Sequence, residues 1–483
     1  MKTVLLISPN STPEINESRY VSPAPGIVRL AGYINSKGHY AVAFDPNMYD
    51  LDNTTIPLKE KILERKWDII GVSCLEETLV NDINNIWLAK KLSPDSLLVA
   101  GGIEAQYNYQ TILDKSPCNI VVIGEGEVPL LMLCDEKRLD EIPGLVIKNK
   151  AWLLNQQDFS IATESIDWEN IPYESYWDYY VKKYGDTITE EIKKQIYTVR
   201  VFSKNRCPFS CKFCTSSNQL SDATGVNAKC HGLSVDSLIG IVKRIKESHP
   251  LVKTIYITDD DFCLNSEYVI DFCKQLIRKS LHTLYYMCFA RATDLNDEML
   301  MWMRYAGFRR LNVGVESFSD NVLEEVGKKC TVEQIRKSLA KLKTHNIEGF
   351  LTFILVTPGS TIEDLVATVT EAMRYCDDPH FTLGLALGVR PTKGSEFFET
   401  NYDFETYITK LGAPTKEIHI KENKMIYARD PVVKSIQVLY KRREKEYIAR
   451  YIKMNGIKHG TYSNLAKAQL SLLKECIDII TMK

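Results

Sequence analysis

The sequence lacks a charge excess of either sign. It contains 60 Lys and Arg residues against 62 Asp and Glu, a formal net charge of −2 over 483 residues. Such a balance argues against a bulk electrostatic attraction to nucleic acid or to an anionic membrane. The chain also lacks any apolar run near the roughly 18–20 residues of a membrane span. We therefore predict no nucleic-acid partner and no membrane span.

The opening of the sequence does not predict a secretory signal. The opening "MKTVLLISPNS" has only four apolar residues after Lys2. The apolar core of a signal peptide needs roughly 7–15 residues, so this stretch better fits a first buried strand. We therefore expect a cytoplasmic location.

Paired cysteines are not indicated either. The chain has 13 cysteines, an odd number, and a disulfide framework is not expected in a cytosolic chain of this length. Most lie in apolar or mixed surroundings, where cysteine acts as a small buried hydrophobe. Cys207, Cys211 and Cys214 differ, because they fall within the nine residues "RCPFSCKFC" with the spacing of ligands.

Residues 1–145 alternate short apolar runs with amphipathic helical stretches. The predicted strands cover 3–8, 41–44, 68–73, 97–102 and 119–124. This alternation predicts a Rossmann-like parallel sheet with helices on both faces. Ligands of such sheets bind beyond the carboxyl ends of the strands. The turn residues found at those ends are Ser8, Pro9, Asn10, Ser73, Cys74, Gly101, Gly102, Gly124, Glu125, Gly126 and Glu127.

The remainder of the chain divides into three predicted parts. Residues 146–195 are aromatic and polar without a clean period, and we interpret them as an ordered linker. Residues 196–395 predict a partial (β/α)6 barrel, because six strand–helix units fit where a full barrel takes roughly 250 residues. Residues 396–483 predict a helical C-terminal domain, whose basic run 440–453 we interpret as a solvated helix face. The six predicted barrel strands are 197–203, 254–258, 285–290, 310–315, 350–356 and 382–389.

Thiolates suit zinc or iron–sulfur clusters, and spacing alone leaves three kinds of centre open. Zinc would need a fourth ligand such as Cys230 or His231, because structural zinc sites are closed and four-coordinate. A four-cysteine electron-transfer cluster would again use Cys230. A three-thiolate cluster would leave one iron open to a substrate. The trio follows the first predicted barrel strand, at the rim where barrel active sites are built, and this position favours the open cluster.

The motif "CPFSCKFC" resembles the Cys-x3-Cys-x-aromatic-Cys motif of radical S-adenosylmethionine (SAM) enzymes. The resemblance extends through "YITDDDFCLN", "ARATDLNDEMLMWMRYAGFRRLNVGVES" and "FLTFILVTPGSTIED", and covers about 197–390. It implies a [4Fe–4S] cluster held by Cys207, Cys211 and Cys214, with SAM on the open iron. It also implies a reducing electron donor of the flavodoxin or ferredoxin type.

Residues at the ends of the barrel strands are candidates for binding SAM. Arg291 could pair with a carboxylate. Phe213 could lie against adenine. Hydrogen bonds from ribose hydroxyls or from the methionyl amine could be accepted by Glu316 and Ser317, and Thr357 begins a turn that allows close backbone approach.

One strand end departs from the family pattern. "TDDDF" stands where many relatives carry a Gly-Gly-Glu-Pro motif that holds the methionyl amine. We name Asp260 as the candidate for that contact. The alternative is that Asp259, Asp260 and Asp261 form a helix-capping, solvated turn.

The first 145 residues resemble the cobalamin-binding domain of class B radical SAM methylases. The matching segments are "APGIVRLAGYINSKGH", "IIGVSC", "LLVAGGIEA" and "VVIGEGEVPLL". The resemblance implies that the turn residues of this sheet contact cobalamin. Many cobalamin proteins carry Asp-x-His-x-x-Gly after the first strand, but the loop here has no histidine. His39 lies beyond the following helix, where we expect a solvated residue.

The two resemblances together imply a cobalamin-dependent radical SAM methyltransferase. Such an enzyme moves a methyl group from SAM through methylcobalamin to an unactivated carbon, using a 5′-deoxyadenosyl radical. The substrate would be a small molecule or a peptide. One alternative keeps the radical chemistry but performs a rearrangement, cyclisation, oxidation or coupling. The other is a non-catalytic metal- or cobalamin-binding sensor with a closed metal site.

Overall fold

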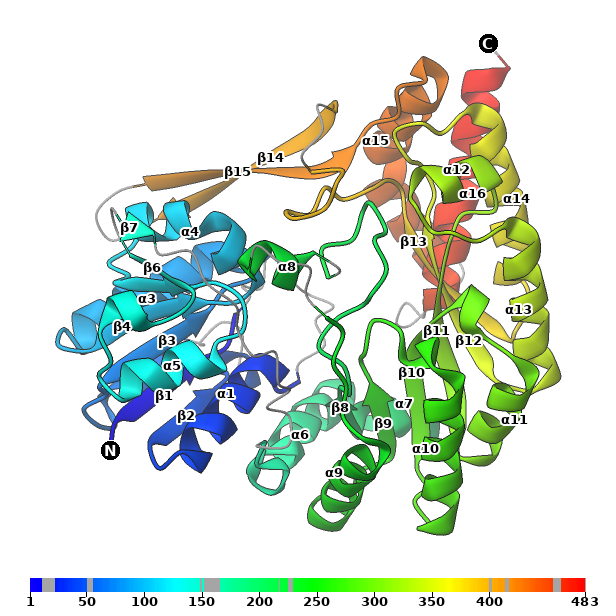
Figure 1. Ribbon diagram of the computed structural model, residues 1–483. Coiled ribbons are helices and arrows are strands. Elements are labelled where there is room, and N and C mark those ends of the chain that lie inside the picture. The colour runs from blue at the N-terminus through cyan, green and yellow to red at the C-terminus, as the bar shows by residue number, and fades with distance from the viewer. Residues whose placement is uncertain are drawn as a thin grey trace. The chain divides into compact units, whose positions relative to one another are not determined.

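The computed structural model (Figure 1) describes residues 1–10, 22–49, 55–147, 150–151, 166–216, 218–224, 229–398, 402–412, 417–454 and 462–482. The chain forms two compact units. The first contains residues 1–208, 216–254 and 409–420, and the second contains 209–215, 255–408 and 421–483. The expected histidine-free loop after the first strand falls mainly on 11–21, outside the described residues.

The first unit is built on a seven-stranded sheet in the order β2-β1-β3-β4-β5-β6-β7. The strands β1 to β5 are parallel, which confirms the predicted Rossmann-like sheet. The order reverses direction at β1, and this switch point is where open α/β sheets bind ligands. The bounds are β1 Thr3–Ile7, β2 Tyr40–Phe44, β3 Ile69–Ser73, β4 Leu97–Gly101, β5 Ile120–Val122, β6 Leu145–Ile147 and β7 Lys150–Ala151.

Helices cover both faces of this sheet. Apolar residues of α1 and α5 pack on one face, and those of α2, α3 and α4 pack on the other. Helix α1 ends just before Gly38, whose φ of +86° is typical of glycine after the last turn of a helix. The bounds are α1 Pro25–Ser36, α2 Thr55–Leu63, α3 Leu79–Leu92, α4 Ile103–Lys115 and α5 Glu127–Cys134.

Two parts of the first unit differ from the sequence expectation. The short strands β6 and β7 add an antiparallel edge to the sheet. The stretch interpreted as a linker contains two helices, α6 Tyr173–Tyr184 and α7 Glu190–Ile196. Helix α6 buries Tyr173, Tyr176, Trp177 and Tyr180, so aromatic packing compensates for its weak apolar period.

The second sheet has six strands in the order β13-β12-β11-β10-β9-β8, as a partial barrel requires. Strands β10 to β13 pair with one another in parallel. All six predicted strands are present, and the fold class is confirmed. The bounds are β8 Thr198–Val201, β9 Thr254–Ile257, β10 Tyr285–Arg291, β11 Phe308–Glu316, β12 Glu348–Ile354 and β13 Phe381–Ala386.

Amphipathic helices follow the strands of this sheet. The N-termini of α9 to α14 are capped by side chains, as at Ser234, which accepts a hydrogen bond from Ser237 N. Along β10 and β12, buried residues alternate with half-exposed ones, so one face of the sheet carries the helical layer. The bounds are α8 Gln219–Thr224, α9 Val235–Ser248, α10 Ser266–Arg278, α11 Asp297–Tyr305, α12 Asp320–Glu325, α13 Val332–Thr344 and α14 Ile362–Cys376.

The C-terminal region is helical at its end but begins with a two-stranded sheet. Strands β14 Phe404–Gly412 and β15 Glu417–Ile426 were not expected, although their Thr, Tyr and Ile residues favour strands. Helices α15 Pro431–Met454 and α16 Tyr462–Thr481 follow, and α16 packs on α14, α15 and β13. The basic run lies on α15, where Arg443 pairs with Glu475 at 2.7 Å and most neighbours are half-buried or exposed, as a solvated face predicts.

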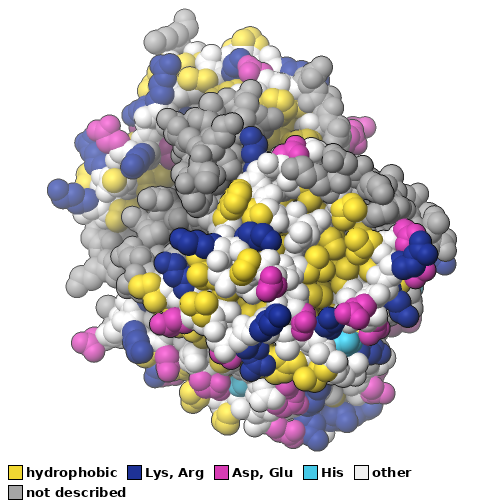
Figure 2. All heavy atoms as spheres, turned by 90° about the vertical axis from the view of Figure 1, so that its left-hand side faces the viewer, with side chains coloured by type: hydrophobic (Ala, Val, Ile, Leu, Met, Phe, Trp, Pro, Cys, Tyr) yellow, Lys and Arg dark blue, Asp and Glu magenta, His cyan; other side chains and the backbone are white. Residues whose placement is uncertain are grey.

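The described residues on the face drawn in Figure 2 carry charges of both signs. In Figure 2, Lys and Arg side chains are interspersed with Asp and Glu, which agrees with the balanced charge. Among the residues that the structure describes, no helix is long and apolar enough to cross a bilayer.

Candidate functional site

The cysteine motif forms a loop after β8, and its three cysteines are half-buried. The loop turns on a hydrogen bond from Cys214 N to Cys211 O at 3.0 Å. Lys212 N donates to Val326 O at 3.0 Å, which ties the loop to the residues after α12. Among the described residues, no three His, Cys, Asp or Glu side chains converge on a single metal ion. The thiolates of a cubane cluster bind different irons, so an iron–sulfur site does not require such convergence.

Arg291, at the end of β10, lies beside this motif. Its guanidinium carbon is 3.4 Å from the centroid of the Phe209 ring, within "CPFSCKFC". Its Nη2 donates to the carbonyl oxygen of Lys328. The residue is only 6% exposed, yet its Nε and Nη1 atoms have no hydrogen-bond partner among the residues that the structure describes. Buried donors are rarely left unsatisfied, so these two indicate a missing acceptor such as a carboxylate.

Glu316, at the end of β11, forms a buried ion pair. Its Oε1 lies 2.7 Å from Lys328 Nζ, and both side chains are 8% exposed. Burial alone would lower the pKa of Lys328, but the Glu316 carboxylate outweighs it and the pKa is raised. Glu316 has a φ of +63° at an irregularity in the β11–β12 register. A left-handed backbone is costly for a residue with a side chain, and such strain concentrates at functional sites.

Gly314 makes room for this ion pair. A Cβ atom placed on it would lie 2.6 Å from Glu316 Oε1 and 2.6 Å from Lys328 Nζ. Any side chain at this position would therefore displace the pair. The glycine in "NVGVES" is explained by the site and not by a turn.

Helix α12 connects the cysteine loop to the turn after β12. Glu325, its last residue, accepts hydrogen bonds from Gly359 N at 2.7 Å and from Thr357 Oγ1. The next residue, Val326, accepts from Lys212 N. This short helix therefore holds two loops that the sequence analysis assigned to the site.

Two predicted SAM contacts have other partners in the structure. The Ser317 hydroxyl is buried and lies 2.7 Å from Thr368 Oγ1 on α14, which differs from the expected ligand-facing hydroxyl. The Thr357 side chain is fully buried and bonded to Glu325 and Ser360, which leaves its backbone turn as the candidate contact. Both hydroxyls serve the fold because they satisfy neighbouring loop and helix groups.

Phe213 and the three aspartates of the "TDDDF" turn differ in burial and in their partners. Phe213 packs against an apolar cluster that includes Val326 and Phe397. Asp260 is exposed, whereas Asp259 and Asp261 are each 3% exposed. Asp261 caps the short helix that follows by accepting from Cys263 N at 3.1 Å. The capping alternative is therefore confirmed for Asp261, and the role of Asp260 stays a prediction.

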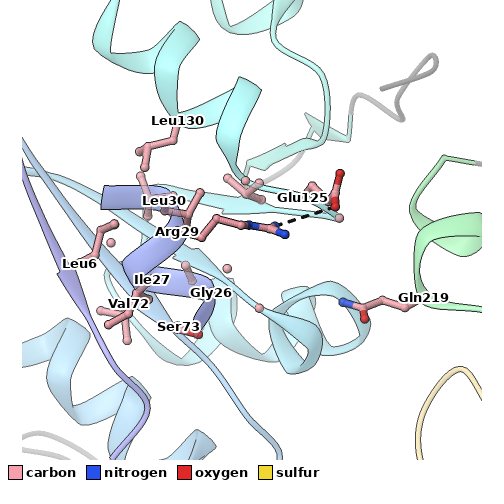
Figure 3. Close-up of a pocket in the computed structure, with 18 of the residues that line it drawn as sticks. Leu6, Gly26, Ile27, Arg29, Leu30, Val72, Ser73, Glu125, Leu130 and Gln219 are labelled. Atoms are coloured by element: carbon pink, nitrogen blue, oxygen red, sulfur yellow. Dashed lines mark ion pairs between the residues drawn. The ribbon is translucent and has the colours of Figure 1, made fainter. Parts of the chain in front are cut away.

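A cavity of about 280 Å³ lies at the carboxyl ends of β1, β3, β4 and β5 in the first unit. Figure 3 shows Leu6, Ile27, Leu30, Val72 and Leu130 around it, with Gln219 contributed by α8. Six predicted residues line it: Ser73, Gly101, Gly102, Gly124, Glu125 and Gly126. The glycines leave the rim open because they carry no side chains.

Gly102 has a second function at this rim. Its φ of +96° and ψ of 175° are almost restricted to glycine. A Cβ atom here would lie 2.9 Å from Cys74 O and 3.1 Å from Ser73 Oγ. The turn after β4 can therefore lie against the end of β3 only with glycine at this position.

One cation lies in the wall of the cavity. Arg29 of α1 forms ion pairs with Glu125, at 3.9 Å, and with Glu127. Its guanidinium also lies 5.7 Å from the ring centroid of Phe202. Figure 3 shows Arg29 extended toward Glu125. The ion pair of Glu127 with Arg29 therefore holds the loop after β5 against α1. Arg29 could not be predicted from a strand end, because it lies inside a helix.

Five of the turn residues predicted to contact cobalamin lie outside the lining of the cavity: Ser8, Pro9, Asn10, Cys74 and Glu127. Cys74 is fully buried in the sheet core, which raises its pKa well above the usual value. The Pro9 carbonyl accepts from Asn47 at 2.8 Å, and Asn10 Oδ1 accepts from Asn85 at 2.5 Å. Cys74 thus packs as a small hydrophobe, and Asn10 is 5% exposed in a buried amide pair.

His39 precedes β2, at the amino end of the strand. Its Nε2 lies 3.1 Å from Asp135 Oδ1, and its Nδ1 accepts from Lys2 N at 3.2 Å. The cavity lies at the opposite, carboxyl ends of the parallel strands. His39 thus lies at the helix end, as expected, but its side chain is only 11% exposed and both ring nitrogens have partners, so the prediction of a solvated residue was wrong.

Further cysteines lie near the motif. Cys230 is exposed, and its Sγ lies 3.2 Å from the carbonyl oxygen of Arg206, next to Cys207. Cys330 is half-buried and close enough to Cys211 for their charges to interact, while burial raises its pKa. Sequence spacing pointed to Cys230 but could not point to Cys330, which is distant along the chain.

Two family models match the chain. A radical SAM superfamily model matches residues 201–372, and a B12-binding domain model matches residues 14–133. These matches give the chain a radical SAM domain and a B12-binding domain. A radical SAM domain implies a [4Fe–4S] cluster and SAM, and a B12-binding domain implies cobalamin.

Curated relatives include enzymes of more than one activity. The chain is 26% identical over 391 residues to the anaerobic magnesium-protoporphyrin IX monomethyl ester cyclase of Rubrivivax gelatinosus, covering 78% of this chain and 66% of the cyclase. It is 25% identical to the uncharacterized methyltransferase PH0819 of Pyrococcus horikoshii, covering 79% and 80%. The chain thus spans just under two thirds of the length of the cyclase.

Solved structures share the fold. The radical SAM methyltransferase TsrM from Kitasatospora setae, with tryptophan and a SAM analogue bound, matches with a TM-score of 0.64 and 16% identity over 82% of this chain and 75% of that one. The cobalamin-dependent SAM radical enzyme OxsB, with aqua-cobalamin and SAM bound, matches with a TM-score of 0.67 and 16% identity over 100% and 72%.

Proposed function

We propose that this radical SAM enzyme is a cobalamin-dependent methyltransferase that methylates an unactivated carbon of a small molecule or peptide. The observation that carries the proposal is the pairing of two built sites in one chain. One is a strand-end cavity in a B12-binding domain, and the other is a three-cysteine motif beside a buried arginine with two unsatisfied donors. A methyltransferase among the relatives supports it.

The donor set near the motif fits a cluster with SAM. Cys207, Cys211 and Cys214 would hold the [4Fe–4S] cluster, which supplies an electron when it is bound and reduced. Arg291 would bind the carboxylate of SAM through the two donors that lack an acceptor. Glu316 would accept from the amine or the ribose, and its ion pair holds the carboxylate in place.

The cavity of the first unit fits the planar base of the cobalamin tail. Its wall is largely apolar, and its volume of about 280 Å³ suits one flat ring system better than a whole corrin. The glycines of the rim would admit the attached chain, and Arg29 would stay in place through Glu125 and Glu127. When bound, cobalamin supplies a carrier for the methyl group.

The test is anaerobic reconstitution with iron, sulfide and cobalamin, followed by SAM, a reductant and a cell extract. A methyltransferase should yield both S-adenosylhomocysteine and 5′-deoxyadenosine, with a product heavier by roughly 14 Da, a methyl replacing a hydrogen. 5′-Deoxyadenosine without S-adenosylhomocysteine would contradict methyl transfer while leaving the radical chemistry intact.

A second candidate is a non-methylating radical reaction with the same two cofactors. The specific observation in its favour is the similarity to a cyclase over most of the chain. The products of the same reconstitution decide between the two. The non-catalytic sensor requires a closed metal site, and Cys230→Ala tests it: an iron-loaded protein whose cluster still responds to SAM would exclude Cys230 as the closing ligand.

A further inference from the structure

Lys328 is a buried cation that the proposed SAM contacts share. It is 6% exposed and follows α12 in the loop after β11. The sequence offers no reason to single it out, because Lys329 stands beside it and is exposed. A buried lysine is unusual unless it is paired, and this one has its partner in Glu316.

The ammonium of Lys328 fixes one proposed contact. Its Nζ lies 2.7 Å from Glu316 Oε1, inside the space that Gly314 leaves open. Glu316 has a left-handed backbone, with a φ of +63°, a costly conformation that persists only under a constraint from the surrounding structure. Lys328 supplies that constraint as a charge-assisted hydrogen bond.

The backbone of Lys328 fixes the other proposed contact. Its carbonyl oxygen accepts from Arg291 Nη2, while the Phe209 ring covers the face of the guanidinium. These two contacts hold the planar group and leave Nε and Nη1 without an acceptor. One residue thus contacts both a carboxylate and a guanidinium, the two charges complementary to the ammonium and carboxylate of an amino acid.

We propose that Lys328 is the positioning residue for SAM: its ammonium orients Glu316 and its backbone orients Arg291, so that the two receive the amino-acid end of SAM together. This inference rests on the proposed function, because it assumes that SAM binds at Glu316 and Arg291. The alternative is that Lys328 only neutralises a buried carboxylate and contributes to stability alone.

The main experiment compares Lys328→Met with Lys329→Met, which removes the same charge from the exposed neighbour. Each reconstituted variant is measured for iron content, thermal unfolding and SAM affinity by equilibrium dialysis. We expect Lys328→Met to retain its iron and to bind SAM about tenfold more weakly, the loss of roughly one charge-assisted hydrogen bond. Lys329→Met should match the wild type in all three measurements.

A spectroscopic readout separates positioning from stability. SAM bound to the open iron should change the electron paramagnetic resonance spectrum of the reduced cluster in the wild type. Lys328→Met should show that change only at higher SAM concentration, and Lys328→Arg should restore part of it. A folded Lys328→Met that binds SAM with wild-type affinity and shows the wild-type spectral change would overturn the proposal.

Two further variants keep the test decisive. If Lys328→Met does not fold, the double variant Glu316→Gln with Lys328→Met removes both buried charges and avoids an unpaired carboxylate. The proposal expects the double variant to bind SAM no more weakly than Glu316→Gln, because Lys328 acts on that side through Glu316. Independent, multiplying losses would contradict it. Failure of the wild type itself to bind SAM would refute the proposed function instead.

Discussion

The two candidate sites are built by opposite means. The cavity of the first unit is formed by what its residues lack: glycines at the strand ends leave space, and most of the wall is apolar. The site beside the cysteine motif is formed by charged side chains that are buried and paired, with Arg291, Glu316 and Lys328 in contact. The first kind of site suits a flat apolar group held by shape, and the second suits a small ligand held by charge.

The largest expected effect comes from the cysteine motif, and it tests whether the two sites are independent. Cys211→Ser should abolish the cluster, and with it the SAM-dependent activity, because a thiolate ligand is lost. Cobalamin should still bind, since the cavity is lined only by residues of the first unit. Iron analysis and cobalamin absorbance after gel filtration measure the two cofactors separately.

Cys330→Ser is the control for that variant. Cys330 lies close to Cys211 but outside the motif, so its loss should leave the iron content unchanged. Loss of iron in Cys330→Ser would mean that the polypeptide occupies the fourth iron, and the open-cluster interpretation would fail.

A moderate effect is expected at the glycine rim. Gly102→Ala forces a side chain onto a backbone with a φ of +96° and brings Cβ within 2.9 Å of Cys74 O. We expect a loss of roughly 1–3 kcal/mol in unfolding free energy and weaker cobalamin binding. Denaturant unfolding and a cobalamin titration measure the two effects.

Gly101→Ala provides the matched comparison. It also lines the cavity, but its Cβ would have no atom within 4 Å. It should unfold like the wild type, and weaker cobalamin binding in this variant would then report on the ligand itself. Equal unfolding of Gly101→Ala and Gly102→Ala would remove the argument from backbone geometry.

The sequence predicted the parts of both sites that follow from strand ends. Apolar runs marked the strands, the turn residues after them marked the rim of the cavity, and the same logic found Arg291 and Glu316. It assigned a ligand contact to the Ser317 hydroxyl, which instead bonds to Thr368. A hydroxyl at a strand end has several possible partners, and the sequence does not show which helix lies nearest.

Lys328, Arg29 and Glu325 could not be found in the same way. Each lies in or just after a helix, where charged residues are usually solvated, and only packing shows that they are held by partners. Strands β14 and β15 were not predicted from the sequence for a related reason. Both segments are rich in charged residues, so local propensity did not distinguish them from an exposed helix.

The smallest expected effect lies in the helix that joins two loops of the charged site. Glu325→Gln keeps the shape of the side chain but replaces a charged acceptor of the bonds from Gly359 N and Thr357 Oγ1. Charge-assisted hydrogen bonds are stronger than neutral ones, so we expect a loss of roughly 1 kcal/mol in unfolding free energy and a small weakening of SAM binding. Glu324→Gln, on the exposed neighbour, should change neither quantity. If the two variants behave alike, α12 does not hold the turn after β12, and the charged site depends on Lys328, Glu316 and Arg291 alone.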